Sequence, residues 1–111
     1  MNTTTVVAVL AAGAVAAAAP NAVAGDAGAG RQKALQCQTC HGLDGVAKLP
    51  EAPNLAGQSE VYLVKALKDF RSGERRNDMM SLVIANLKDA DIADLAAYYA
   101  AIPVTAGTPP R

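Results

Sequence analysis

The segment that decides the fold is Cys37-Gln38-Thr39-Cys40-His41. The spacing C-x-x-C-H is the signature of covalent haem attachment. Each thiol can add to one vinyl group of a porphyrin, and the two residues between the cysteines match the separation of the two vinyls. The histidine that follows Cys40 then lies beneath the iron, which requires an imidazole nitrogen. We therefore predict one haem c, bound through Cys37 and Cys40, with His41 as an axial ligand of the iron.

Three other sites use similar residues. A zinc site needs about four ligands, but these two cysteines and His41 are the only Cys and His residues of the chain. A thioredoxin-like dithiol needs a βαβ setting, and no segment alternates apolar and polar residues as a strand does. A disulfide suits an oxidising compartment, but it leaves the adjacent histidine without a role. Haem attachment is the reading that uses all three residues.

The second axial ligand must come from another part of the chain. No second histidine exists, and Met79 and Met80 are the only thioethers apart from Met1. A methionine ligand raises the reduction potential relative to a second histidine, which suits an electron carrier. Neighbouring residues on a helix differ in direction by roughly 100°, so only one of these two methionines can point at the iron. From the residues alone, both remain candidates.

Length and composition limit the functions available to the chain. Its 111 residues are enough for one domain. The formal net charge is zero, which disfavours nucleic-acid binding because that function usually leaves a basic excess. Hydrophobic residues make up 51%, but aromatic residues only 4%, and Trp is absent. An apolar prosthetic group would compensate for this poor supply of large core residues.

The first 24 residues resemble a signal peptide. An uncharged run from Val6 to Ala19 is followed by Pro20, and Ala22-Val23-Ala24 supplies the small residues that a signal peptidase reads. We expect cleavage near Ala24, export to the periplasm, a functional domain over residues 25–103 and a loose tail over residues 104–111. The alternative is a retained membrane anchor, although a spanning helix needs about 20 apolar residues.

The rest of the chain predicts an all-α protein. Residues 25–30 look like a linker, residues 31–39 a helix, and residues 42–57 a Gly- and Pro-rich loop. Ser59 is a plausible N-cap for a helix to about Arg71, with an apolar stripe of Leu63, Leu67 and Phe70. An apolar segment follows over residues 79–87, and Asp89 can cap a last helix that Pro103 ends. The runner-up is an ordinary four-helix bundle, which the long loop disfavours.

These features together resemble the class I cytochromes c of the small bacterial type, and one half of the periplasmic dihaem cytochromes c. The resemblance covers about residues 28–102. It rests on the following motifs: Cys37-Gln38-Thr39-Cys40-His41-Gly42, Asp44-Gly45, Pro53-Asn54-Leu55-Ala56-Gly57-Gln58, Tyr62-Leu63, Leu67-Lys68-Asp69-Phe70-Arg71-Ser72-Gly73, Asn77-Asp78-Met79-Met80 and Asp91-Ile92-Ala93-Asp94-Leu95-Ala96-Ala97-Tyr98-Tyr99.

The resemblance implies a fold of three to four short helices around one covalently bound haem. It implies that Met80, seven residues before Leu87, is the distal ligand, with Met79 as the alternative. It also implies that the carbonyl of Pro53 accepts a hydrogen bond from the second ring nitrogen of His41, which would orient the ring. The terminal helices of this family cross at small residues. Gly30 and Ala34 facing Leu95 and Tyr99 are the candidates for that crossing.

The function that follows is periplasmic transfer of single electrons, without catalysis and without a small-molecule substrate. The alternatives are a haem subunit of a periplasmic dehydrogenase and an open-site haem peroxidase or sensor. We expect redox proteins as partners, no nucleic acid, and membrane contact only if the signal is retained. The segment Lys65–Arg76 carries five positive and two negative side chains. It is either a docking surface or a solvated helix face.

Overall fold

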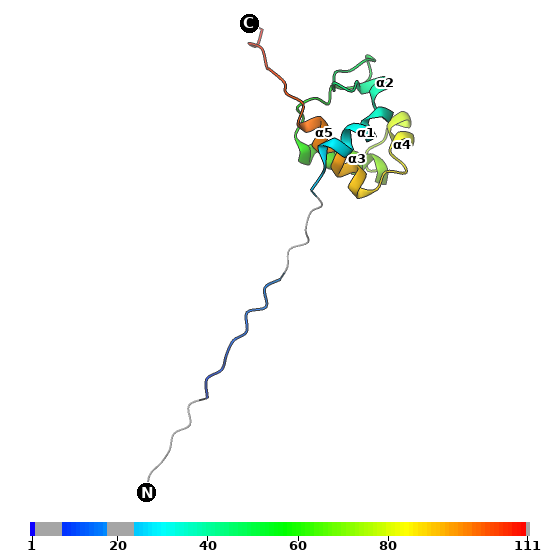
Figure 1. Cartoon of the computed structure of the whole chain (residues 1–111). Coiled ribbons are helices and arrows are strands. Elements are labelled where there is room, and N and C mark those ends of the chain that lie inside the picture. Colours follow the sequence, from blue (N-terminus) through cyan, green and yellow to red (C-terminus); the bar gives the residue numbers. More distant parts are fainter. Residues whose placement is uncertain (2–7, 18–23, 111) are drawn as a thin grey trace.

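The computed structural model describes residues 1, 8–17 and 24–110. Its elements are α1 (Ala27–Lys33), the 3₁₀ turn η1 (Ala34–Gln36), α2 (Gln38–His41), α3 (Glu60–Ser72), α4 (Asp78–Val83) and α5 (Asp89–Ala100), shown in Figure 1. The ranges described contain no strand, so the predicted all-α class is correct.

The predicted signal peptide, residues 1–24, is described only in part. Residues 2–7 and 18–23, including most of the expected cleavage site, lie outside the described residues, and residues 8–17 have no secondary structure. No helix in the described part of the chain is long and apolar enough to cross a membrane. Residues 104–110, the predicted tail, have no helix either.

The first helix begins earlier than the sequence predicts. The Asp26 carboxylate accepts a hydrogen bond from the Ala29 N–H at 2.9 Å and caps α1, so residues 25–30 are not a linker. The predicted helix over residues 31–39 is also wrong as one unit, because η1 interrupts it before α2. Gly28 and Gly30 are poor helix formers by propensity. Their placement in a helix is a consequence of the packing described next.

The helices α1 and α5 cross in close contact. A Cβ atom added to Gly30 would lie 2.0 Å from the Asp94 carbonyl oxygen and 2.8 Å from the Cβ of Tyr98. Gly30 therefore faces Asp94 and Tyr98, one position away from the predicted Leu95 and Tyr99. Ala34 is fully buried in a cluster with these two residues, as predicted. The absence of a side chain on Gly30 allows the two backbones to meet.

An ion-pair cluster also joins these two helices. The Lys33 ammonium lies 2.8 Å from the Asp91 carboxylate and 2.5 Å from the Asp94 carboxylate. The other Asp94 carboxylate oxygen accepts a hydrogen bond from the Asp26 N–H at 2.7 Å. These contacts connect both ends of α1 with the first half of α5, and Asp26 and Asp94 are 68 residues apart along the chain.

The predicted N-cap of α3 is correct, and the predicted N-cap of α5 is wrong. The Ser59 hydroxyl accepts from the Tyr62 N–H and caps α3, and Gly73 ends the helix at a positive φ of 82°. Asp89, however, is the first residue of α5 and not its cap. The cap position is Lys88, whose N–H donates to the Asp91 carboxylate at 2.9 Å. Asp89 instead pairs with Arg71, at 2.5 Å.

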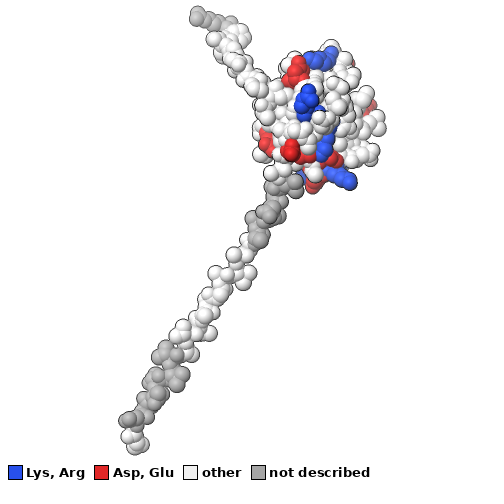
Figure 2. Space-filling view, viewed as in Figure 1, with Lys and Arg blue, Asp and Glu red and all other residues white. Residues whose placement is uncertain are grey.

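The basic segment Lys65–Arg76 is extensively paired. Lys65 pairs with Asp69, and Lys68 and Arg71 both pair with Asp89. On the face that Figure 2 displays, positive and negative side chains are intermixed. The local excess of positive charge counted along the sequence is therefore reduced in the folded protein by a carboxylate from α5.

The buried core is small. The buried apolar residues are Ala34, Leu63, Ile84, Ile92, Ala93, Leu95, Ala96 and Tyr99, and three of them are alanines. An ordinary four-helix bundle would bury more large side chains in its core than this. The helices instead surround a space between α2, α3, α4 and α5, and that space is the candidate site.

Candidate functional site

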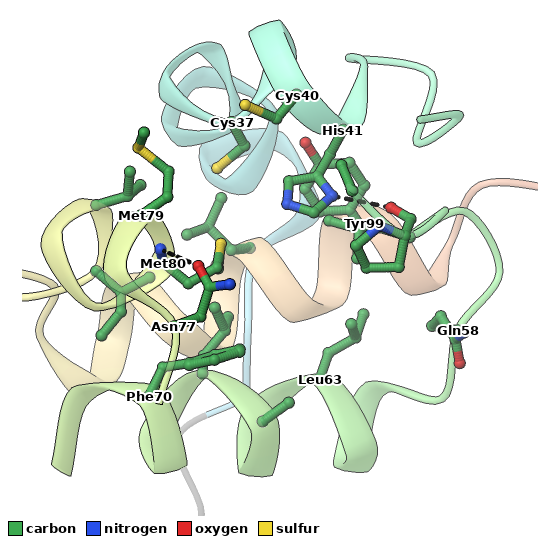
Figure 3. Close-up of a pocket in the computed structure, with 18 of the residues that line it drawn as sticks. Cys37, Cys40, His41, Gln58, Leu63, Phe70, Asn77, Met79, Met80 and Tyr99 are labelled. Carbon is green, nitrogen blue, oxygen red and sulfur yellow. Dashed lines mark hydrogen bonds between the residues drawn. The ribbon is translucent and has the colours of Figure 1, made fainter. Parts of the chain in front are cut away.

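The site is a cavity of about 620 Å³, shown in Figure 3. Much of its wall is apolar. The predicted stripe of α3 faces into it, together with side chains from α4 and α5: Leu63, Leu67, Phe70, Val83, Ile84 and Leu95. The stripe would ordinarily pack against another helix. Here it borders a space large enough for a flat apolar ring system.

Two thiols line the wall of the cavity at α2. Cys37 immediately precedes α2, and its carbonyl accepts a hydrogen bond from the His41 N–H at 3.0 Å. One helical turn therefore carries Cys37, Cys40 and His41 on the same wall. Both cysteines are half-buried free thiols, and Figure 3 shows them on the side of the cavity opposite α3.

Burial keeps this wall uncharged. It raises the pKa of the Cys37 thiol to about 11, and the neighbouring Tyr99 hydroxyl opposes that shift only in part. Burial also raises the pKa of the Tyr99 hydroxyl. Both groups are therefore neutral at neutral pH. An apolar group bound next to the thiols would therefore not contact a charged Cys37 or Tyr99 side chain.

His41 is held in one orientation by the loop after α2. Its side chain is 7% exposed, and Nδ1 lies 2.9 Å from the carbonyl oxygen of Pro53. A carbonyl oxygen only accepts, so Nδ1–H is the donor. In the neutral ring the lone pair is then on Nε2, which is the nitrogen available to a metal.

Two glycines shape the loop that places Pro53. Gly42 and Gly45 have φ angles of 71° and 72°, a conformation that other residues rarely adopt. The Gly45 carbonyl accepts hydrogen bonds from the Leu55 and Ala56 N–H groups at 2.8 and 3.0 Å. The loop thus folds back on itself and brings Pro53 next to the His41 ring.

Two tyrosines of α5 anchor the same loop. The Tyr98 hydroxyl donates to the Leu43 carbonyl at 2.6 Å, and the Tyr99 hydroxyl donates to the Gly42 carbonyl at 3.2 Å. The sequence predicts Tyr99 at the crossing of the terminal helices and gives Tyr98 no separate role. The partner carbonyls lie 55 and 57 residues away along the chain, and no local pattern in the sequence indicates such pairs.

The two methionines of α4 differ in orientation. Met79 is 61% exposed, whereas Met80 is partly buried. Figure 3 shows the Met80 thioether entering the cavity from the side facing His41, while Met79 lies at its edge. The Asn77 carboxamide oxygen accepts from the Met80 N–H at 2.9 Å and caps α4. Asparagine is favoured at helix starts, but the sequence analysis did not identify Asn77 as this cap.

Comparison with known proteins shows to which family the chain belongs. The family description "Cytochrome c" matches residues 26–101. The chain belongs to the cytochrome c family. Its cofactor is haem c, and the cavity fits such a group on three counts: the apolar wall, the paired thiols and the free imidazole nitrogen. Among the described residues, no three His, Cys, Asp or Glu side chains gather as a site for a bare metal ion.

Curated relatives share this cytochrome domain. The chain is 46% identical over 84 residues to "Cytochrome c4" of Pseudomonas aeruginosa, covering 76% of this chain and 42% of that protein. It is 47% identical over 79 residues to "Cytochrome c-554(548)" of Halomonas halodenitrificans, covering 68% of this chain and 95% of that protein. The chain therefore spans less than half of the cytochrome c4 and nearly all of the cytochrome c-554(548).

Solved structures show the same fold. Reduced recombinant cytochrome c4 from Pseudomonas stutzeri superposes with a TM-score of 0.70 at 39% identity, over 76% of this chain and 49% of that one. A thiosulfate dehydrogenase (TsdBA) from Marichromatium purpuratum superposes with a TM-score of 0.65 at 33% identity, over 69% of this chain and 19% of that one. The predicted class I cytochrome c fold is confirmed.

Proposed function

We propose that this cytochrome carries single electrons between redox proteins in the periplasm. In this proposal Cys37 and Cys40 bind the haem covalently, and His41 and Met80 ligate its iron. The observation that supports it best is the convergence of these four side chains on one apolar cavity (Figure 3). Haem supplies the one-electron chemistry, while the protein contributes ligation, burial and the setting of the potential.

Each residue has a distinct task in this proposal. The Pro53 carbonyl holds Nδ1–H of His41 and leaves Nε2 directed at the metal position. The Asn77 cap holds the start of α4 so that the Met80 sulfur stays inside the cavity. The apolar side chains of α3, α4 and α5 exclude water, and exclusion of water is one of the factors that tune the potential.

Mass spectrometry and optical spectra test this function. Protein produced together with haem-attachment machinery should carry one haem that survives denaturing electrophoresis. It should show a reversible one-electron couple and, when oxidised, the weak charge-transfer band of methionine-ligated iron. A mass equal to the bare polypeptide would contradict the proposal.

A second candidate is a haem subunit of a dehydrogenase complex. It is supported by the similarity to part of the thiosulfate dehydrogenase (TsdBA) structure. A complex with an enzyme that persists through purification from the native host would favour this candidate. Purification as an isolated chain with rapid electron exchange would favour the free carrier.

The open-site alternative fits the geometry less well. A peroxidase or gas sensor needs a vacant iron position, whereas Met80 occupies the wall opposite His41. Carbon monoxide addition to the reduced protein separates the two cases. No change in the spectrum supports a closed site, and rapid binding supports an open one.

The location is part of the proposal. We infer that residues 1–24 direct export and are removed near Ala24. Sequencing of the N-terminus of protein purified from the periplasm measures this directly. A start at Gly25 supports cleavage, and a membrane-bound chain that retains Met1 supports an anchor.

Docking through Lys65–Arg76 remains a hypothesis for partner recognition. The ion pairs with Asp69 and Asp89 leave a weaker positive field than the residue count suggests. Lys65→Glu should lower the electron-transfer rate with a natural partner at low salt, and salt should diminish the difference because exposed charges are screened over about 8–10 Å. Lys48→Glu, in the loop after α2, is the matched charge reversal. Equal rates for both variants would exclude a docking role for this segment.

A further inference from the structure

One basic side chain lines the apolar cavity. Among the described residues that border it, Arg75 is the only Lys or Arg. The acidic residues on the same border are Glu51, in the loop after α2, and Asp78, in α4. Within the described part of the chain, no carboxylate lies at ion-pair distance from the Arg75 guanidinium, in contrast to Lys65, Lys68 and Arg71 nearby.

Arg75 is held in place by α3. Its Cζ lies 4.6 Å from the centroid of the Phe70 ring, and its Nη1 donates to the Tyr62 hydroxyl at 3.5 Å. The backbone N–H of Arg75 also donates to the Asp69 carbonyl at 3.0 Å. The guanidinium is therefore stacked on an aromatic face, which is a favourable contact for a cation.

This position lies across the cavity from the thiols. Figure 3 shows Phe70 on the wall formed by α3, with Cys37 and Cys40 on the opposite wall. In a haem the two vinyl groups and the two propionate groups are on opposite edges of the porphyrin. If the vinyl edge is bonded to Cys37 and Cys40, the propionate edge is directed toward α3.

We infer that Arg75, assisted by the Tyr62 hydroxyl, binds a haem propionate carboxylate. The inference rests on the proposed covalent attachment of haem at Cys37 and Cys40. A carboxylate beside apolar side chains is costly without a partner, and arginine can provide two parallel hydrogen bonds to it. Arg75 would keep this propionate ionised and place one fixed positive charge near the iron.

Both effects act on the reduction potential. The positive charge of Arg75 favours the reduced iron, which carries one positive charge fewer than the oxidised iron. Without Arg75 the propionate would hold its proton more strongly, and more strongly still in the reduced protein. The potential would then fall as the pH rises through the propionate titration.

The experiment compares Arg75→Gln with Arg76→Gln in the haem-loaded protein. Both variants lose one positive charge from neighbouring exposed positions, but Arg76 does not line the cavity. We expect Arg75→Gln to shift the equilibrium toward oxidised protein by about tenfold at pH 8, which is about 59 mV for one electron. The shift should be smaller at pH 5. Arg76→Gln should change the potential less, with the pH profile of the wild type.

Two further variants separate hydrogen bonding from charge. Tyr62→Phe removes one hydrogen-bond donor. Its reduction potential should fall with rising pH as in Arg75→Gln, but by less. Arg75→Lys should keep a reduction potential close to that of the wild type. If Arg75→Gln does not fold, Tyr62→Phe still tests the inference. Equal shifts for Arg75→Gln and Arg76→Gln, or wild-type pH profiles for Arg75→Gln and Tyr62→Phe, would overturn it.

The same samples distinguish this inference from the proposed function. Wild-type protein without covalent haem or without a reversible one-electron couple would contradict the function itself. Wild-type protein with both, combined with unaltered pH profiles in the variants, would contradict only the role of Arg75. Asp78→Asn measured in parallel reveals any contribution from the acidic residue of α4 that borders the cavity.

Discussion

At the scale of single residues, a few polar contacts prepare the side chains of the site. The Pro53 carbonyl selects the His41 tautomer that leaves Nε2 free. The Asn77 carboxamide caps α4, which begins at Asp78, one residue before Met79. These contacts are short-range, and their effect is to restrict the orientation of the histidine and the adjacent methionine.

The clearest residue-scale prediction concerns Met80 and Met79. Met80→Ala should abolish the charge-transfer band of the oxidised protein, lower the reduction potential and admit carbon monoxide, because the thioether inside the cavity is removed. Met79→Ala should keep the band. Since Met79 is 61% exposed, its truncation should cost less than the roughly 2–5 kcal/mol typical of a buried methionine.

Optical spectra and chemical denaturation measure both effects. Loss of the band in Met79→Ala together with its retention in Met80→Ala would reverse the assignment. Loss in both would point to a general loosening of α4.

At the scale of elements, the contact between α1 and α5 brings the two ends of the domain together. Gly30 permits the close approach of the backbones. Lys33, Asp91 and Asp94 form the charged cluster beside it. Steric fit and charge therefore act at the same crossing.

Two glycines of α1 provide a matched test of the steric fit. Gly30→Ala should destabilise the protein by about 1–3 kcal/mol or more, because the new Cβ would lie 2.0 Å from a backbone oxygen of α5. Gly28→Ala meets only the Asp26 carboxylate, at 3.1 Å. It should be neutral or stabilising by about 0.5–1 kcal/mol, since alanine is the better helix former. Equal losses in denaturation midpoint for the two variants would contradict the close crossing.

The charged cluster predicts a pH dependence of stability. The hydrogen bond from Lys33 lowers the pKa of Asp91, and the Asp26 N–H, followed by Lys33, lowers the pKa of Asp94. Their stabilising contribution is therefore present above the unfolded carboxyl pKa of about 3.9 and is lost as the pH falls through the lower folded values. The pKa of Lys33 is raised by Asp91 and Asp94, so its contribution is lost only as the pH rises above 10.5.

Thermal unfolding midpoints between pH 2.5 and 7 test this cluster. Asp94→Asn should lower the midpoint at pH 7 and flatten the decline below pH 4, whereas Glu74→Gln in the turn after α3 should follow the wild type. An acid decline in Asp94→Asn as steep as that of the wild type would show that the cluster contributes nothing.

At the scale of the whole molecule, haem and fold depend on each other. The eight buried apolar residues include three alanines, while the large side chains of α3 and α4 line a cavity. The protein around this cavity is small, and small domains bury a modest fraction of their surface. The haem would complete the core as well as carry the electron.

We accordingly expect the chain without haem to be largely unfolded. A Cys37→Ala, Cys40→Ala variant produced without haem should show weak helical circular dichroism and little cooperative melting. The haem-loaded wild type is the control, and it should melt in one sharp transition. A sharp native-like transition in the haem-free variant would show that the helices pack stably without the cofactor.

The sequence by itself determined what depends on neighbouring residues. The C-x-x-C-H motif, the Ser59 cap and the stripe of Leu63, Leu67 and Phe70 are local patterns. Haem chemistry, helix capping and helical periodicity act over a few residues, so these patterns predicted the haem, the all-α class and the bounds of α3 to within one residue.

Only the tertiary structure decided which residues meet across long separations. It showed that residues 25–30 belong to the crossing with α5, and that Asp89 pairs with Arg71 instead of capping α5. The tyrosine contacts to the loop after His41 join residues more than 50 positions apart. Such contacts depend on the packing of whole elements against one another, and local propensity carries no information about that packing.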